Sequence, residues 1–175
     1  TGTAPLTIQG YSTAAGDGGI GGISGNALVS IINTTNDFIH FKDMHLHNSG
    51  AAVLVTIDGQ CWVDNCELDN TTANMLVLGA AAQVTRCYLH NGAAIGIQCG
   101  SNNWIKFNVF ENGANDFTTA LNLPGGLSGG SYSNNVFDLD GASKGIVGGS
   151  SIGPFVENNN VYSSAGTGIG IDLAS

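Results

Sequence analysis

Short stretches of alternating apolar and polar residues recur along the chain with one shared layout. An apolar residue comes first, Met, Cys or Asn stands at the fourth position, and Leu, Phe or Val stands at the sixth. The segments are FKDMHLHN from Phe41, VDNCELDN from Val63, VTRCYLHN from Val84, IKFNVFEN from Ile105, YSNNVFDL from Tyr132 and VENNNVYS from Val156. Their starts are 22, 21, 21, 27 and 24 residues apart. This spacing indicates an internal repeat.

Each segment is followed by a short polar turn and a second apolar run, such as VLVTIDG from Val53. Alternation with period 2 is typical of strands, and no helical period of 3.6 residues accompanies it. One pair of strands per repeat cannot bury its own inner face. Stacking the repeats as successive coils buries it, with equivalent residues about 4.8 Å apart. The pattern therefore predicts an all-β parallel β-solenoid of about six to seven coils.

Stacked coils place equivalent positions of the repeat in columns. The sixth position predicts one interior column, formed by Leu46, Leu68, Leu89, Phe110, Phe137 and Val161. The fourth position predicts a second, formed by Met44, Cys66, Cys87, Asn108, Asn135 and Asn159. At the eighth position, a recurring Asn predicts a ladder whose side chains bond backbone groups of the next coil. Its members are Asn48, Asn70, Asn91 and Asn112.

The stretch NNWIKFNVFENGANDFTTALNL resembles the repeats of pectin-lyase-like, right-handed parallel β-helix proteins, a superfamily that includes polysaccharide lyases, hydrolases and phage tailspikes. The resemblance covers about residues 27–175 and implies a single-stranded, right-handed parallel β-helix domain there. Parallel crossovers have the same right-handed bias in general. We expect residues 1–26 to form a partial first coil with a Gly-rich turn. The helix that usually caps such proteins at the N-terminus is missing, so we expect a fragment of a longer chain.

Composition narrows the range of partners. The chain has four Lys and Arg against 13 Asp and Glu, a formal net charge of −9. Nucleic acids and anionic membranes need clustered Lys and Arg, so neither is expected as a partner. No metal-ligand spacing links the four cysteines, and no cofactor is expected, although calcium could bridge an acidic glycan. Few charges and abundant Gly, Asn, Ser and Thr favour an extracellular or virion-surface location.

Outward positions of the early coils carry the candidate chemistry. Residues two apart on a strand point the same way, and coils stack closely, so the fifth and seventh positions form one patch. The candidates for catalysis are His47, Glu67, Asp69 and His90, and those for carbohydrate binding are His45, Tyr88 and Glu111. Such a group suits proton transfer or sugar recognition. The simpler alternative is an ordinary polar solenoid surface with coil-to-coil hydrogen bonds. No metal ligands are assigned, because three side chains would have to converge from a flat surface.

The resemblance does not assign a catalytic role. Polygalacturonase-like hydrolases carry Asp-Asp, His-Gly and Arg-Ile-Lys motifs, and mannuronan-epimerase-like proteins carry Asp-Pro-His. None of these motifs occurs in this sequence, where WIKF from Trp104 is the nearest approach to Arg-Ile-Lys. The only arginine, Arg86, stands at the third position of its repeat, where a bend is expected.

Three functions therefore remain open. The preferred one is a non-catalytic structural or glycan-facing module of a fibre-like or tailspike-like surface protein. The alternative is a polysaccharide lyase or glycosidase that uses the outward patch. The third is a self-associating piece, a homo-oligomer or end-to-end assembly, because open coil ends are unpaired sheet edges.

Overall fold

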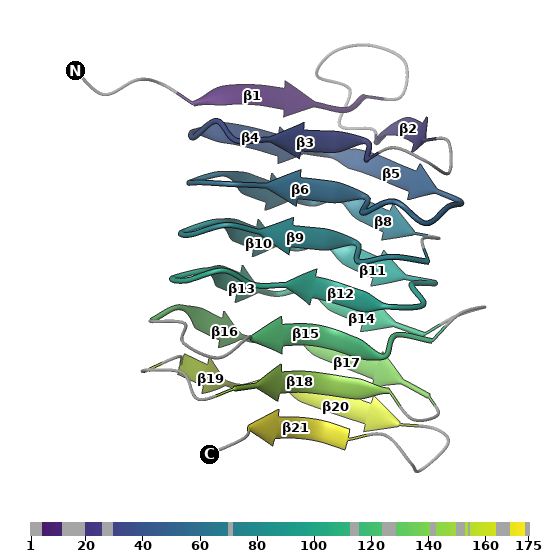
Figure 1. The fold of residues 1–175 in the computed structure, drawn as a ribbon, viewed down its shortest axis with the longest axis vertical. Helices are drawn as coiled ribbons and strands as arrows, with labels where there is room; N and C mark the ends of the chain where they lie inside the picture. Colours follow the sequence, from purple (N-terminus) through teal and green to yellow (C-terminus); the bar gives the residue numbers. More distant parts are fainter. Residues whose placement is uncertain are drawn as a thin grey trace.

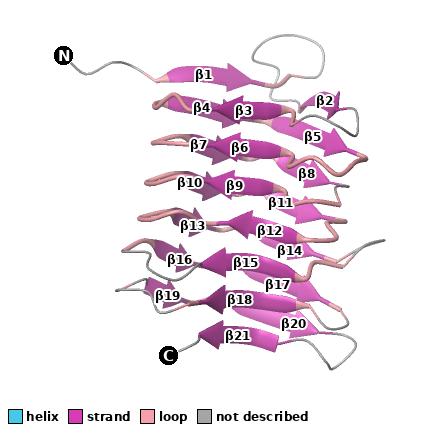
Figure 2. Cartoon of the chain, viewed as in Figure 1, coloured by secondary structure: helices cyan, strands magenta, loops and turns pink. Residues whose placement is uncertain are grey.

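The computed structural model describes residues 5–11, 20–25, 30–69, 72–112, 116–123, 129–140, 143–149, 153, 155–163 and 169–173. Within these residues all regular structure is β-strand, and every strand pairs with its neighbours in parallel. Figure 2 shows the strands and the described loops between them. In the described part of the chain no helix is long and apolar enough to cross a membrane.

The strands form three sheets of seven strands each, and every coil gives one strand to each sheet. The first sheet consists of β1 (Leu6–Gln9), β4 (Ile39–Lys42), β7 (Trp62–Asp64), β10 (Gln83–Thr85), β13 (Trp104–Lys106), β16 (Ser131–Ser133) and β19 (Phe155–Glu157). The second consists of β2 (Gly21–Gly25), β5 (Met44–Asn48), β8 (Glu67–Asp69), β11 (Tyr88–His90), β14 (Val109–Glu111), β17 (Val136–Leu139) and β20 (Asn160–Ser163). The third consists of β3 (Ile32–Thr34), β6 (Val55–Ile57), β9 (Leu76–Leu78), β12 (Ile95–Gln98), β15 (Thr119–Leu123), β18 (Lys144–Gly148) and β21 (Ile169–Leu173).

The chain winds as a right-handed parallel β-solenoid, with β1 and β21 at opposite ends of the stack (Figure 1). The predicted fold class and coil number are confirmed. The prediction of one strand pair per coil was wrong, because the repeated phrase spans two strands with a bend between them. The division at residue 26 stays a prediction, although β1 and β2 pair with β4 and β5 of the next coil.

The bend lies at the third position of every aligned segment. There the backbone adopts the left-handed conformation, with φ between 50° and 61°. Asn and Asp tolerate this conformation better than other non-glycine residues because their short side chains bond locally. Four of the six bends use them, and the other two do not. The bend residues are Asp43, Asn65, Arg86, Phe107, Asn134 and Asn158.

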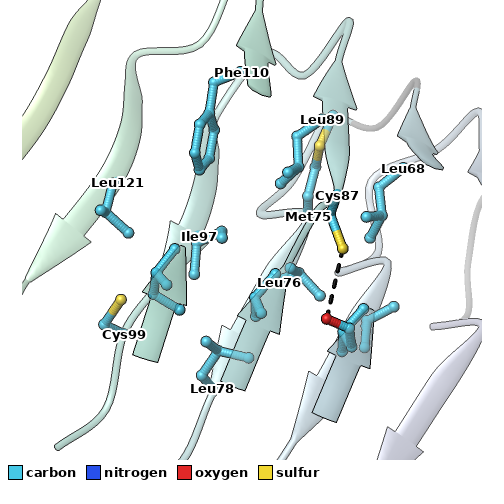
Figure 3. Packing of buried hydrophobic residues seen from close by; sticks show 14 of the residues in the cluster. Leu68, Met75, Leu76, Leu78, Cys87, Leu89, Ile97, Cys99, Phe110 and Leu121 are labelled. Atoms are coloured by element: carbon cyan, nitrogen blue, oxygen red, sulfur yellow. Dashed lines mark hydrogen bonds between the residues drawn. The ribbon is translucent and has the colours of Figure 1, made fainter. Parts of the chain in front are cut away.

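Both predicted interior columns are confirmed. In the sixth-position column, Leu46, Leu68, Leu89 and Phe110 pair in register between successive coils and are fully buried. The rings of Phe110 and Phe137 stack with centroids 4.8 Å apart. Figure 3 shows this column packed against buried residues of the third sheet, such as Leu76 and Ile97. Close packing also explains Gly96, because a Cβ there would lie 2.5 Å from the Ala120 carbonyl oxygen.

The fourth-position column changes from sulfur to amide along its length. Cys66 and Cys87 are buried free thiols, and the Cys87 thiol bonds the Val63 carbonyl at 3.6 Å (Figure 3). Burial raises the pKa of the Cys87 thiol well above its ordinary value. Beyond Cys87 the column continues as Asn108, Asn135 and Asn159, whose side chains bond one another from coil to coil.

The ladder predicted at the eighth position stays a prediction, because Asn70 lies outside the described residues. Its other members make different contacts. The Asn48 side chain accepts a bond from the backbone N–H of Gly50, within its own turn. Asn112 reaches the next turn, where its Nδ2 donates to the Asp140 carbonyl and to Ser143 Oγ.

Candidate functional site

The predicted outward patch lies on the second sheet, where strand register places its members in two adjacent columns. We call these seven residues the imidazole–carboxylate face. The fifth-position column contains His45, Glu67 and Tyr88, and the seventh-position column contains His47, Asp69, His90 and Glu111. All seven side chains are partly buried. The sheet therefore brings together three imidazoles, three carboxylates and one phenol, from four successive strands.

Asp69 lies between two imidazoles of the preceding coil. Its Oδ1 is 2.5 Å from Nδ1 of His47, a short hydrogen bond. Its Oδ2 is 3.4 Å from Nε2 of His45 but does not form a hydrogen bond with it. The His45 Nε2 atom is shielded from solvent and has no hydrogen-bond partner. The Asp69 carboxylate thus orients His47 and leaves Nε2 of His45 without a hydrogen bond.

His90 is held from three sides. Its Nε2 lies 3.0 Å from Oε1 of Glu67, and its Nδ1 lies 2.8 Å from Nδ2 of Asn91. The Nδ2 of Asn91 can only donate to that ring nitrogen, so with this contact the proton of a neutral His90 sits on Nε2 and points at Glu67. The Tyr88 ring stacks on the imidazole with centroids 4.4 Å apart.

Tyr88 is bound to the last carboxylate of the face. Its hydroxyl donates to Oε2 of Glu111 over 2.5 Å. Burial and this hydrogen bond raise the pKa of Tyr88 to about 12, because both favour the neutral phenol. Tyr88 therefore serves as a hydrogen-bond donor and a flat ring at neutral pH rather than as a base.

A hollow adjoins the imidazole–carboxylate face on its N-terminal side. It has a volume of about 340 Å³ and is lined by Gly22, Ile23 and Ser24 of β2 and by His45 and His47 of β5. The space gives a small ligand or a water molecule access to both imidazoles. Chemically, the face offers paired proton acceptors and donors, or nitrogen and oxygen ligands for a cation.

A second feature, on the first sheet, was missed by sequence reasoning. We call it the first-sheet column, because the residue just before each aligned segment faces outward there and stacks in register. Trp62 has the His40 and Phe38 rings within 6.5 Å, and Trp104 is 39% exposed. The signal was present in the sequence, one position before the first residue of the repeat. The column consists of His40, Trp62, Gln83, Trp104, Ser131 and Phe155.

Arg86 forms an ion pair with Asp64 beside this column. Its guanidinium bonds Oδ2 of Asp64, while Oδ1 of the same carboxylate accepts a 2.6 Å bond from the Thr85 hydroxyl. The only arginine of the chain is therefore held in an ion pair with Asp64.

Comparison with known proteins gives one match. The family described as "Right handed beta helix region" matches residues 27–175. A search of curated proteins and a search of solved structures gave no match. The matched range includes every strand from β3 to β21.

Proposed function

Because the chain belongs to the right-handed β-helix family, we propose that it is a structural, non-catalytic module that presents the first-sheet column to a polysaccharide. A β-helix of this family supports a structural or carbohydrate-related role in general. The finer assignment, a glycan-facing wall in an extracellular or virion-surface protein, is our proposal.

The observation that carries the proposal is the outward aromatic series of the first-sheet column. An exposed Trp offers a flat apolar face with a polar N–H at its edge, which matches the C–H face and hydroxyl rim of a pyranose ring. Trp62 and Trp104 are two coils apart, which corresponds to about 10 Å at the spacing of parallel strands. Phe155, 70% exposed, continues the series two coils further on. A regular series of rings suits a ligand that repeats along its length.

Charge favours a neutral polysaccharide over an acidic one. The chain carries four Lys and Arg and a formal net charge of −9, so a polyuronate would meet net repulsion. Arg86 is already paired with Asp64, and Lys42 lies 3.4 Å from an oxygen of Asp43. A neutral glycan needs ring stacking and hydroxyl contacts, and Gln83 and Ser131 lie between the rings to supply the latter.

The test is binding of soluble neutral and acidic polysaccharides, measured by affinity electrophoresis and calorimetry. Trp62→Ala and Trp104→Ala should each weaken binding of a neutral glycan at least tenfold. Tyr162→Ala is the matched control, because Tyr162 is an aromatic residue of the second sheet with 57% exposure. Equal losses in all three variants, or no binding to any glycan, would contradict the proposal.

A second candidate function rests on the imidazole–carboxylate face. His47 with Asp69, and His90 with Glu67, are two oriented imidazole–carboxylate pairs on neighbouring coils. Such pairs suit general acid–base catalysis in a polysaccharide lyase or glycosidase. The test is a depolymerisation screen that scores new reducing ends and unsaturated products, with and without calcium. Turnover that disappears in a folded His47→Ala, Asp69→Ala, His90→Ala triple variant would establish an enzyme.

A further inference from the structure

Three side chains of the imidazole–carboxylate face converge on one point. We propose that His45, Glu67 and Asp69 bind a divalent transition-metal ion of the Zn²⁺ type. Their ligand atoms all lie within 4.8 Å of one another, although they come from the outer surface of a sheet. The site lies on the second sheet and does not depend on glycan binding by the first.

The separations between ligand atoms fit a small cation. Nε2 of His45 is 3.4 Å from Oδ2 of Asp69 and 4.0 Å from Oε1 of Glu67. A tetrahedral ion that is bound at roughly 2.1 Å holds its ligands about 3.4 Å apart. One separation already has this value, and the second is close to it. The diagonal placement of His45 and Asp69, which belong to neighbouring columns and neighbouring coils, produces the convergence.

Neighbouring imidazoles hold the two carboxylates in place. His47 Nδ1–H donates a hydrogen bond to Oδ1 of Asp69 over 2.5 Å, so Oδ2 of the same carboxylate is the oxygen turned toward His45. His90 Nε2 lies 3.0 Å from Oε1 of Glu67. Metal-ligating groups are regularly oriented by such outer hydrogen bonds, whose loss typically costs about 10–100-fold in metal affinity.

Nε2 of His45 lacks a hydrogen-bond partner. It is shielded from solvent and makes no hydrogen bond, which is costly for a polar atom. A bound cation would satisfy it directly and would also neutralise the two nearby carboxylates. His45 also lines a hollow of about 340 Å³ on its β2 side, to which neither Glu67 nor Asp69 contributes. Three protein ligands leave one position of a tetrahedral zinc ion for water, as in accessible zinc sites.

The donor set determines the class of metal. Imidazole nitrogen suits Zn²⁺, Cu²⁺, Ni²⁺ and Co²⁺, whereas Ca²⁺ takes six to eight oxygen ligands. This site offers one nitrogen and two carboxylates, so calcium is disfavoured. The competing arrangement is a metal-free cluster in which the imidazoles and carboxylates only neutralise one another. The metal site and the metal-free cluster differ in the role of His45. In the metal site its Nε2 is a ligand, whereas in the metal-free cluster it has no role beyond the pairs made by His47 and His90.

The experiment titrates the metal-free protein with Zn²⁺ and with Ca²⁺ by calorimetry, and follows Co²⁺ binding by its ligand-field absorption. We expect one Zn²⁺ per chain, a tetrahedral Co²⁺ spectrum and no comparable binding of Ca²⁺. His45→Ala and Asp69→Asn should each weaken Zn²⁺ binding at least tenfold. His40→Ala should leave it unchanged, because His40 is a partly buried imidazole of the first sheet, 3.9 Å from Asp64.

Circular dichroism of each variant separates loss of the site from loss of the fold. Absence of Zn²⁺ binding to the folded wild-type protein would overturn the proposal. So would equal Zn²⁺ binding by wild type and His45→Ala, or equal weakening by His40→Ala. Binding of Ca²⁺ with the same affinity as Zn²⁺ would overturn the assignment of the metal class.

Discussion

Asn108 and Asn135 are 27 residues apart in the chain, and the Nδ2 of Asn108 donates to the Oδ1 of Asn135 over 3.0 Å. The same oxygen accepts the backbone N–H of Asn108, also at 3.0 Å. Asn135 repeats both contacts with Asn159 in the next coil. The left-handed bends at Phe107 and Asn134 precede Asn108 and Asn135, and the backbone N–H of each of these two residues bonds the side-chain amide of the following coil.

We expect Asn135→Ala to destabilise the protein substantially. It removes the acceptor of the Asn108 backbone N–H and the donor to the Ile105 carbonyl, both in the interior. Each buried polar group left unpaired costs about 1–3 kcal/mol. Urea unfolding followed by circular dichroism measures the loss in free energy of unfolding.

Asn160→Ala is the control for this prediction, because Asn160 is an exposed residue of β20 one position after Asn159. A surface change of this kind alters stability by no more than about 0.5 kcal/mol. If the two variants proved equally stable, the side-chain hydrogen bonds of Asn135 would contribute nothing beyond the strand pairing around it.

Phe107→Asn should make the protein more stable. Phe107 stands at a bend with φ of 61° and is 58% exposed, so its ring gains little from packing. The left-handed conformation costs most residues about 1–2 kcal/mol, and Asn adopts it far more readily. We expect a gain of about 1 kcal/mol in the free energy of unfolding.

Val109→Asn distinguishes the effect of the bend from a general benefit of polarity. Val109 is an exposed residue of β14, two positions later, and is not among the positive-φ residues. Asn is disfavoured in strands, so this variant should lose stability. Equal gains at both positions would show that the backbone conformation at residue 107 is not the cause.

Tyr88 should make the free energy of unfolding fall with rising pH in the alkaline range. Its pKa in the folded protein is about 12, against an ordinary value of 10.0. Between these values the unfolded chain loses the phenol proton while the folded chain keeps it. The contribution of Tyr88 to the free energy of unfolding is therefore complete below pH 10 and is lost as the pH rises toward 12. Unfolding free energies measured across this range should fall more steeply for wild type than for Tyr88→Phe, and parallel curves would refute the assignment.

The fold was predictable because a solenoid repeats its constraints. Leu46, Leu68 and Leu89 occupy one position of the repeat, and each must be buried by the coil above and below. The three-sheet cross-section was harder to predict, because the bend has no single residue signature. Arg86 and Phe107 occupy it although neither favours a positive φ. The repeat required the bend there, and tertiary packing overrode local preference.

The candidate site was predictable only as a set of neighbours. Period 2 and coil stacking place His45, Glu67 and Asp69 on one face without indicating which atoms meet. Their convergence depends on side-chain rotamers that the surrounding imidazoles select.

The first-sheet column was missed for a different reason. Trp62 and Trp104 stand just before the segments that align, and only two of the six aligned segments are preceded by Trp.

Gln83→Trp should strengthen glycan binding if the first-sheet column is the binding surface. Gln83 lies between Trp62 and Trp104 in register, so the substitution would make a continuous row of three rings, each about 4.8 Å from the next. The new ring would contact the bound chain at the sugar between the two that Trp62 and Trp104 contact. We expect a gain of about tenfold in affinity for a long neutral glycan, equivalent to 1.4 kcal/mol, and a smaller gain for a short oligosaccharide that reaches only one ring. Calorimetry with glycans of graded length measures both.

Because the three rings would be adjacent, their contributions should be coupled, and Trp62→Ala should then cost more in the Gln83→Trp background than in the wild type. Weaker binding by Gln83→Trp, in a protein that remains folded, would indicate that Gln83 contacts the sugar hydroxyls itself and that the two Trp rings act as separate sites.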